Sequence, residues 1–187
     1  MNSGMHARKQ TSGCVSSIAS LVLVVGLAFL LAQAAKTFVF QGYEVPSASM
    51  ESTIEVGDMF ISEKVSYYFR EPQAGDVITF QDPDVPGRTL VKRVIAVGGQ
   101  TVDLSSSDGV VYVDGQALDE PYATGGSYPL ISDISYPYTV PEGCLWVMGE
   151  NRENSQDSRY FGAVKASTVT GHAVFTYWPI AHVGVIG

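Results

Sequence analysis

The run Thr89-Leu90-Val91-Lys92-Arg93-Val94-Ile95-Ala96-Val97 combines strand-forming residues with two adjacent basic side chains. Successive side chains of a strand point to opposite faces. Arg93 therefore lies on one face, and Lys92 shares the other with apolar residues, Leu90, Val94 and Ala96. The pattern predicts an apolar strand that holds a lysine against apolar neighbours.

Short β-rich runs separated by turn signals continue on both sides of this strand. The other candidate strands are residues 38–43, 59–63, 76–80, 101–104, 110–113, 144–148 and 168–178. Asp114-Gly115 predicts a tight hairpin turn, and residues 125–138 predict an irregular surface insertion. Since no stretch after residue 36 has the pattern of a long amphipathic helix, we expect a mainly β domain, a folded sheet or barrel-like.

The N-terminal part of the chain has a different character. Residues 10–35 carry no charged side chain, and about 20 apolar residues suffice for a helix to span a bilayer. Arg8 and Lys9 precede this stretch, which favours a cytoplasmic N-terminus. We therefore expect a short cytoplasmic N-terminus (1–10), a transmembrane anchor (11–35) that spans the cell membrane once, and an extracytoplasmic domain (36–187).

The rival interpretation of the apolar stretch is a cleaved signal peptide. Ala32-Gln33-Ala34 has the form of an A-x-A cleavage site, and signal peptides also begin with basic residues. Their apolar region is usually about 7–15 residues long, which is shorter than the stretch found here. The length favours an anchor retained in the lipid bilayer.

Composition excludes several classes of protein. The 187 residues are 45% hydrophobic with a net charge of −8, which argues against disorder and against a nucleic-acid partner. Cys14 and Cys144 have no metal-ligand spacing, and the histidines form no cluster with them. We expect neither a metal site nor a cofactor.

The segment Val45-Pro46-Ser47-Ala48-Ser49-Met50 places two hydroxyls two residues apart behind a proline. In such a stiffened turn one oxygen can attack a carbonyl, while the other hydrogen-bonds the oxyanion that develops. Serines before a turn more often cap backbone groups. This segment alone leaves both interpretations open.

Lys92 is the candidate general base. Burial disfavours the charged form of a lysine and lowers its pKa, from a free value near 10.4 toward the roughly 7–8 that a general base needs. The alternative is that Lys92 extends to water or pairs with a carboxylate. His172 and His182 have no triad context, whereas Ser with Lys is a known variant of triad chemistry.

A dense polar block, Gly149-Glu150-Asn151-Arg152-Glu153-Asn154-Ser155-Gln156-Asp157-Ser158-Arg159, directly follows an apolar strand. Composition allows either a solvated loop or a hydrogen-bonded network that supports a site. Together with three earlier motifs, it resembles the boxes of the bacterial signal peptidase I family, in the family's order. The earlier motifs are Pro46-Ser47-Ala48-Ser49-Met50, Ala74-Gly75-Asp76-Val77-Ile78-Thr79-Phe80 and Val91-Lys92-Arg93-Val94-Ile95.

The resemblance implies a role for each matching residue. Ser49 matches the nucleophile and Lys92 its general base. Ser47 matches the residue whose hydroxyl completes the oxyanion hole with the backbone N–H of Ser49. Ser155 matches the serine that orients the lysine, and the remaining matches support the site: Asp157, Arg159 and Arg93.

The resemblance also implies the reaction. Members of this family remove signal peptides from exported precursor proteins after small-x-small motifs such as Ala-x-Ala. The extended precursor would then lie as an added strand between the segment before Ser49 and the strand leading to Lys92. The single anchor and the short domain resemble the smaller, Gram-positive form of the family.

Some residues depart from the family's pattern. Ser52 stands where proline is common, Glu150 and Glu153 replace aspartates, and residues 98–100 replace a Pro-Gly-Asp turn. These changes concern the support of the site rather than its nucleophile or base.

Two alternative functions use the same fold. A self-cleaving repressor relative also uses Ser and Lys, but the chain has an anchor and no DNA-binding region. A catalytically silent, membrane-anchored binding or assembly module would be expected to lack Ser49 or Lys92, and both are present.

Overall fold

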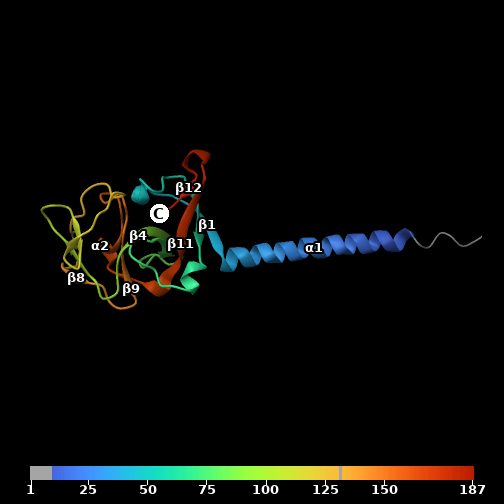
Figure 1. Cartoon of the computed structure of the whole chain (residues 1–187), viewed down its shortest axis with the longest axis horizontal. Coiled ribbons are helices and arrows are strands. Elements are labelled where there is room, and N and C mark those ends of the chain that lie inside the picture. The colour runs from blue at the N-terminus through green and yellow to red at the C-terminus, as the bar shows by residue number, and fades with distance from the viewer. Residues whose placement is uncertain (1–9, 131) are drawn as a thin grey trace, which may run out of the picture. The chain divides into compact units, whose positions relative to one another are not determined.

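The computed structural model describes residues 10–130 and 132–187 (Figure 1). The chain divides into two compact units, Met1–Val39 and Phe40–Gly187. The basic flank of Arg8 and Lys9, and with it nearly all of the expected cytoplasmic N-terminus, lies outside the described residues.

The described part of the first unit consists of one helix, α1 (Gln10–Phe38). Within it, Ser17–Phe38 is long and apolar enough to cross a membrane, a test that an N-terminal signal sequence also passes. Helical hydrogen bonding continues to Val39, whose N–H donates to the carbonyl oxygen of Ala35 at 2.8 Å. The strand expected over residues 38–43 therefore begins only at Phe40.

The second unit is mainly β, as expected. Its larger sheet has eight strands in the order β1-β2-β11-β3-β4-β9-β10, with β12 paired to β11, and every pair is antiparallel. The strands are β1 (Phe40–Glu44), β2 (Met59–Glu63), β3 (Val77–Gln81), β4 (Thr89–Val97), β9 (Cys144–Met148), β10 (Val164–Lys165), β11 (Val169–Trp178) and β12 (Gly184–Val185).

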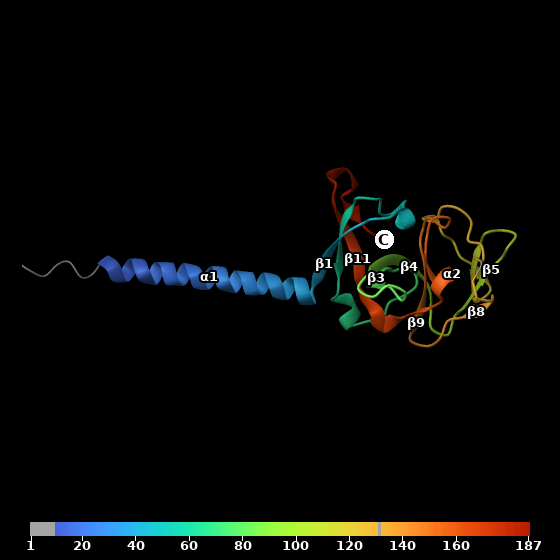
Figure 2. The same cartoon turned by 180° about the vertical axis from the view of Figure 1, so that it is seen from behind.

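A smaller sheet has the order β7-β6-β5-β8. It consists of β5 (Thr101–Leu104), β6 (Val111–Val113), β7 (Gln116–Ala117) and β8 (Tyr138–Thr139). It lies at the end of the domain beyond β9 and the short helix α2 (Ser158–Phe161) (Figures 1 and 2). The hairpin turn expected at Asp114-Gly115 is confirmed, since both residues have positive φ, 53° and 78°.

Two sequence expectations about this domain need correction. Residues 125–138 were expected to be an irregular surface insertion; the described part is irregular up to residue 137, but Ile134 and Tyr136 are partly buried against the core cluster of Trp146. The two-residue strands β7, β8, β10 and β12 were not expected. They are too short to leave an alternating pattern in the sequence.

Strand β4 carries Lys92 and also contributes side chains to the core. It lies between β3 and β9, and its pairing with β9 shifts register between Val94 and Ala96. Such a bulge interrupts the alternation of side chains. Ile95 and Ala96 therefore pack in the same apolar cluster, around Trp146, while Val94 joins the cluster of Ile78. The alternation predicted for the lysine strand thus breaks after Val94.

Candidate active site

The candidate nucleophile lies on a short helical turn, η1 (Ala48–Met50), which follows Pro46 and Ser47. Met50 and Ile54 are fully buried in the cluster that also contains Val45. These apolar side chains fix the turn, because moving it would expose them to water. Ser49 is thereby buried with only 6% of its surface exposed.

The structure brings Ser49 and Lys92 together. Lys92 Nζ lies 2.6 Å from Ser49 Oγ, a hydrogen-bonding distance, although 43 positions separate the two residues in the sequence. Ile78, the cross-strand partner of Lys92 on β3, is fully buried. Within the described part of the chain, the amine thus lies beside a buried apolar side chain and hydrogen-bonds the Ser49 hydroxyl.

Burial lowers the pKa of Lys92 from 10.5 to about 8. The carboxylates of Asp157 and Asp82 oppose this effect and raise the pKa. The guanidinium groups of Arg159 and Arg88 lower it further. Desolvation is the largest cause, as expected for an amine without a contacting carboxylate. Near neutral pH an appreciable fraction of Lys92 is therefore neutral and able to accept a proton.

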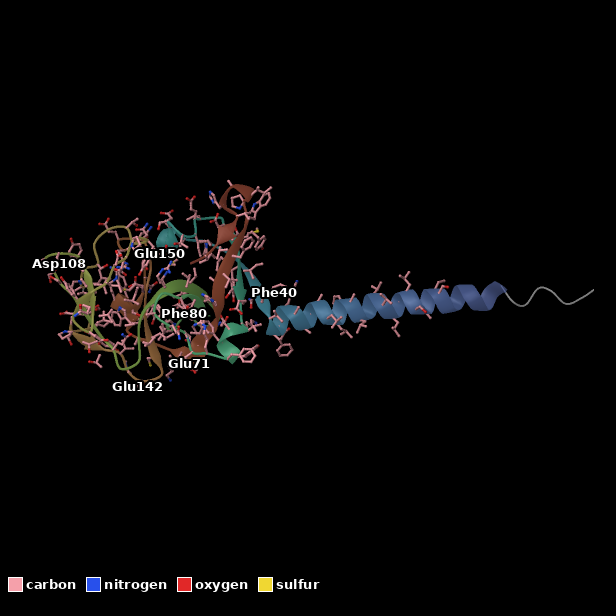
Figure 3. All side chains as sticks on the ribbon, in the orientation of Figure 1. Phe40, Glu71, Phe80, Asp108, Glu142 and Glu150 are labelled. Atoms are coloured by element: carbon pink, nitrogen blue, oxygen red, sulfur yellow. The ribbon has the colours of Figure 1, made fainter. Side chains whose placement is uncertain are left out.

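Arg93, the next residue along β4, lies in a different environment. Its Nε and one terminal nitrogen donate to Glu150 Oε1 at 3.0 and 2.6 Å, and its other terminal nitrogen donates to the carbonyl oxygen of Gly75 at 2.7 Å. Figure 3 places Glu150 beside the segment that carries η1. Consistent with this, the neighbouring Asn151 N–H donates to the carbonyl oxygen of Ser49 at 3.1 Å.

Asp157 and Arg159 form a second buried pair. Arg159 Nε donates to Asp157 Oδ1 and its terminal nitrogen to Asp157 Oδ2, both at 2.9 Å. Asp157 also accepts from the backbone N–H of Gly149 at 3.1 Å and caps α2 through the N–H of Arg159. The pair thus joins the end of β9 to α2 behind the site.

Ser47 and Ser155 make fewer contacts. Ser47 is exposed and its side chain forms no capping bond to η1. Ser155 Oγ is buried and has no hydrogen-bond partner among the described residues, so the expected bond to Lys92 is absent from this arrangement. A Cβ at Gly149 would overlap the Ser155 side chain and the Ser49 carbonyl oxygen, which explains a glycine at that position.

A third group of residues near the site was not predicted from the sequence. Arg152 forms a bidentate pair with Glu120, at 2.9 and 2.6 Å, and its Nε donates to the carbonyl oxygen of Gly149 at 2.8 Å. The ring of Tyr122 lies under the Arg93 guanidinium at 4.1 Å. Glu120 and Tyr122 are separated from these arginines in the sequence and belong to no recognised box, so only the fold could identify them.

The departure at Ser52 has a structural basis. Ser52 has φ 103°, and its hydroxyl donates to the carbonyl oxygen of Tyr122 at 2.6 Å. Proline is restricted to φ near −65° and cannot adopt this conformation. The backbone after the nucleophile is therefore incompatible with the proline that the family commonly has at this position.

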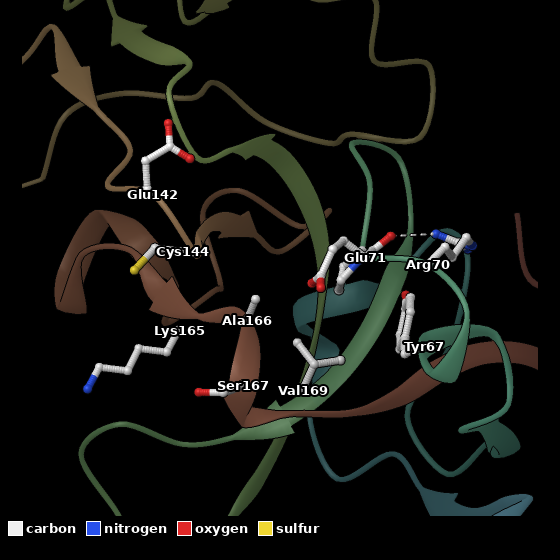
Figure 4. Close-up of a pocket in the computed structure, with 11 residues that line it drawn as sticks. Tyr67, Arg70, Glu71, Glu142, Cys144, Lys165, Ala166, Ser167 and Val169 are labelled. Atoms are coloured by element: carbon white, nitrogen blue, oxygen red, sulfur yellow. Dashed lines mark hydrogen bonds between the residues drawn. The ribbon is translucent and has the colours of Figure 1, made fainter.

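A hollow of about 610 Å³ lies elsewhere on the domain (Figure 4). Its lining includes Tyr67, Glu71, Glu142, Cys144 and Lys165, and neither Ser49 nor Lys92 contributes to it. This hollow is thus separate from the paired serine and lysine.

Comparison with known proteins identifies the family. The model of the family described as "Signal peptidase, peptidase S26" matches residues 18–178. The chain is 39% identical over 168 residues to a probable signal peptidase I-1 of Synechocystis sp., covering 86% of this chain and 83% of that protein. It is 35% identical to signal peptidase I of Mycobacterium tuberculosis, covering 91% of this chain and 76% of that protein.

A solved signal peptidase I from Enterococcus faecalis is 34% identical, with a TM-score of 0.47, covering 55% of this chain and 97% of that one. The family match and the relatives together define a serine peptidase, and hence a hydrolase. The chain belongs to the signal peptidase I family of S26 peptidases.

Proposed function

We propose that this protein is a membrane-bound serine endopeptidase that removes N-terminal signal peptides from exported precursors after Ala-x-Ala-like motifs. Ser49 is the nucleophile and Lys92 is the general base. The observation that carries the proposal is the 2.6 Å contact between Lys92 Nζ and Ser49 Oγ in a site with almost no exposure to water. The names of the relatives supply the substrate class.

In the proposed reaction, neutral Lys92 takes the proton of the Ser49 hydroxyl as its oxygen attacks the scissile carbonyl. Lys92 then protonates the leaving amine, and later activates the water that hydrolyses the acyl-enzyme. The Ser47 hydroxyl and the backbone N–H of Ser49 stabilise the oxyanion. In support, the Ser49 N–H donates no backbone hydrogen bond within the described part of the chain.

The precursor binds as an added strand. Strand β9 pairs with β4 only from Arg93 onward, so Thr89, Lys92 and the two residues between them have a paired neighbour, β3, on one side alone. Pro46 and Ser47, on the segment before the nucleophile, are exposed. An extended peptide between these two backbone segments gains main-chain hydrogen bonds and brings its carbonyl to Ser49.

The apolar helix α1 anchors the enzyme in the cell membrane, with its N-terminus in the cytoplasm and the catalytic domain outside. The length and composition of Ser17–Phe38 support this, as do the basic residues Arg8 and Lys9 before it. The apolar region of a precursor's signal peptide lies in the same bilayer, so an anchored domain would meet its cleavage site at the membrane surface.

The test is cleavage of an exported precursor carrying Ala-x-Ala by the purified full-length protein in detergent, with mass spectrometry of the products. We expect a cut after the small residue that is lost in both Ser49→Ala and Lys92→Ala. The rate at subsaturating substrate should rise with pH through about 8, because only neutral Lys92 can take the proton. Cleavage that persists in both variants would overturn the proposal.

A further inference from the structure

The segment from Glu120 to Ser127 contacts the lysine strand, the turn that follows the nucleophile and the polar block after β9. We propose that Tyr122, assisted by Glu120, is a positioning residue that fixes the nucleophile turn and the lysine strand relative to each other. This inference rests on the proposed function, because it assigns a role within the same reaction. Neither residue touches Ser49 or Lys92 directly.

The first contact is to the lysine strand. The guanidinium of Arg93 lies over the Tyr122 ring, with its Cζ 4.1 Å from the ring centroid, and one of its terminal nitrogens donates to the Glu150 carboxylate at 2.6 Å. A cation over an aromatic face is stabilised most where water is excluded, and only 3% of Arg93 is exposed. Because Arg93 and Lys92 are adjacent on β4, holding one side chain limits the rotation of the strand that aims the other.

The second contact is to the nucleophile turn. The carbonyl oxygen of Tyr122 accepts a hydrogen bond from Ser52 Oγ at 2.6 Å. Ser52 follows Ser49 by three positions and has φ 103°, a conformation that is unfavourable for a residue other than glycine. The bond to Tyr122 helps to hold this unfavourable backbone, and with it the turn that carries Ser49.

The third contact is to the polar block after β9. Glu120 pairs with the buried Arg152 at 2.6 Å and accepts from the Tyr122 hydroxyl at 3.1 Å. The Thr124 N–H donates to the carbonyl oxygen of Glu150 at 2.8 Å, and the Arg152 N–H donates to that of Thr124 at 2.9 Å. The segment is thus hydrogen-bonded, like a short parallel strand, along the residues that hold Ser49.

These contacts explain why two short segments separated by 43 positions meet with a 2.6 Å contact. The two segments share an apolar cluster through Met50 and Val91, and the reacting side chains meet through one hydrogen bond. A displacement of 1 Å in such a site can cost about 10²-fold in rate. Tyr122 contacts the segment of Ser49 through its backbone carbonyl, which bonds to Ser52, and the strand of Lys92 through its ring, which lies against Arg93. Tyr122→Ala keeps the carbonyl bond to Ser52 and removes the ring from Arg93, so it tests the contact to the lysine strand, whereas Ser52→Ala tests the contact to the nucleophile turn.

The experiment compares Tyr122→Ala, Tyr122→Phe and Ser52→Ala in the full-length protein, with Tyr128→Ala as the control from a neighbouring, exposed position. We expect Tyr122→Ala to lower kcat by about 10- to 100-fold with KM nearly unchanged. Ser52→Ala, which removes only the bond to the Tyr122 carbonyl, should have a smaller effect in the same direction. Tyr122→Phe keeps the ring on Arg93 and the backbone carbonyl, so it should retain most activity, as should Tyr128→Ala.

A second readout separates positioning from a merely structural role. The titration of Lys92, followed by ¹⁵N NMR of its side chain, should move upward toward that of a free lysine in Tyr122→Ala, because a loosened site admits water. Unchanged kcat and titration in folded Tyr122→Ala would overturn the proposal. If the wild-type protein cleaves no precursor, the proposed function fails, and the Lys92 titration still decides whether Tyr122 positions it.

Discussion

Lys92 and Arg93 are adjacent on β4 and are both 3% exposed, yet their surroundings differ completely. Arg93 has a carboxylate, two carbonyl oxygens and an aromatic face around it. Lys92 has the buried Ile78 opposite it on β3 and hydrogen-bonds the Ser49 hydroxyl. Two cations equally removed from water are therefore stabilised to very different degrees in their charged forms.

The difference shows that burial alone does not decide a protonation state. An arginine remains charged in proteins and must be paired when it is buried. Burial of a lysine without a contacting carboxylate disfavours the charged form and lowers the pKa, so the amine gives up its proton at a lower pH. The same strand therefore supplies a fixed structural cation on one face and a candidate proton acceptor on the other.

The largest expected effect comes from replacing Lys92 with arginine, the residue type found at the adjacent position 93. Lys92→Arg places a permanently charged group beside Ser49, which can donate a hydrogen bond but cannot accept a proton. We expect turnover to fall about 10³- to 10⁴-fold, as for Lys92→Ala. Steady-state cleavage of an Ala-x-Ala peptide measures this, and substantial activity in Lys92→Arg would remove the lysine from the role of base.

Arg93→Met should lower stability, in addition to the loss of kcat expected when the contact between Tyr122 and the lysine strand is removed. It leaves the Glu150 carboxylate buried without its partner, which typically costs about 3–5 kcal/mol. Chemical denaturation of the full-length protein in detergent would give the change in unfolding free energy. A loss below about 1 kcal/mol would mean that Glu150 is solvated or protonated once Arg93 is removed.

Lys92→Met should instead increase the free energy of unfolding. The pKa of Lys92 is about 8 in the folded protein and 10.5 for the unperturbed side chain, so between these values the unfolded chain binds more protons and wild-type stability rises with pH. The variant lacks this dependence. We expect it to exceed the wild type by on the order of 3 kcal/mol below pH 8, with the gap closing toward pH 10.5. A gap independent of pH would contradict the assigned pKa.

The smallest effect is expected from removing both members of the ion pair. In Arg93→Met combined with Glu150→Leu no unpaired charge remains, and such replacements are often neutral, within about 1 kcal/mol. Denaturation of the double variant beside Arg93→Met isolates the penalty of the orphaned carboxylate. A double variant no more stable than Arg93→Met would show that Arg93 stabilises the domain chiefly through Tyr122 and the carbonyl oxygens.

Local sequence determined much of the fold. The apolar run before Phe38, the strands over residues 59–63, 89–97, 101–104 and 144–148, and the Asp114-Gly115 turn match the structure. These features depend on side-chain periodicity and on backbone preference, which are properties of neighbouring residues. The two-residue strands and the packing of Ile134 and Tyr136 depend on distant partners, and the sequence pattern did not reveal them.

For the site, the sequence by itself determined the candidates: a serine behind a proline, a lysine on an apolar strand and a polar block after β9. Only the tertiary structure decided which groups meet. It brings Lys92 to Ser49, leaves Ser155 Oγ without a partner among the described residues, and places Tyr122 and Glu120 against two arginines. The reason is physical, since a pKa and a hydrogen bond depend on distances and solvent access that the chain acquires only on folding.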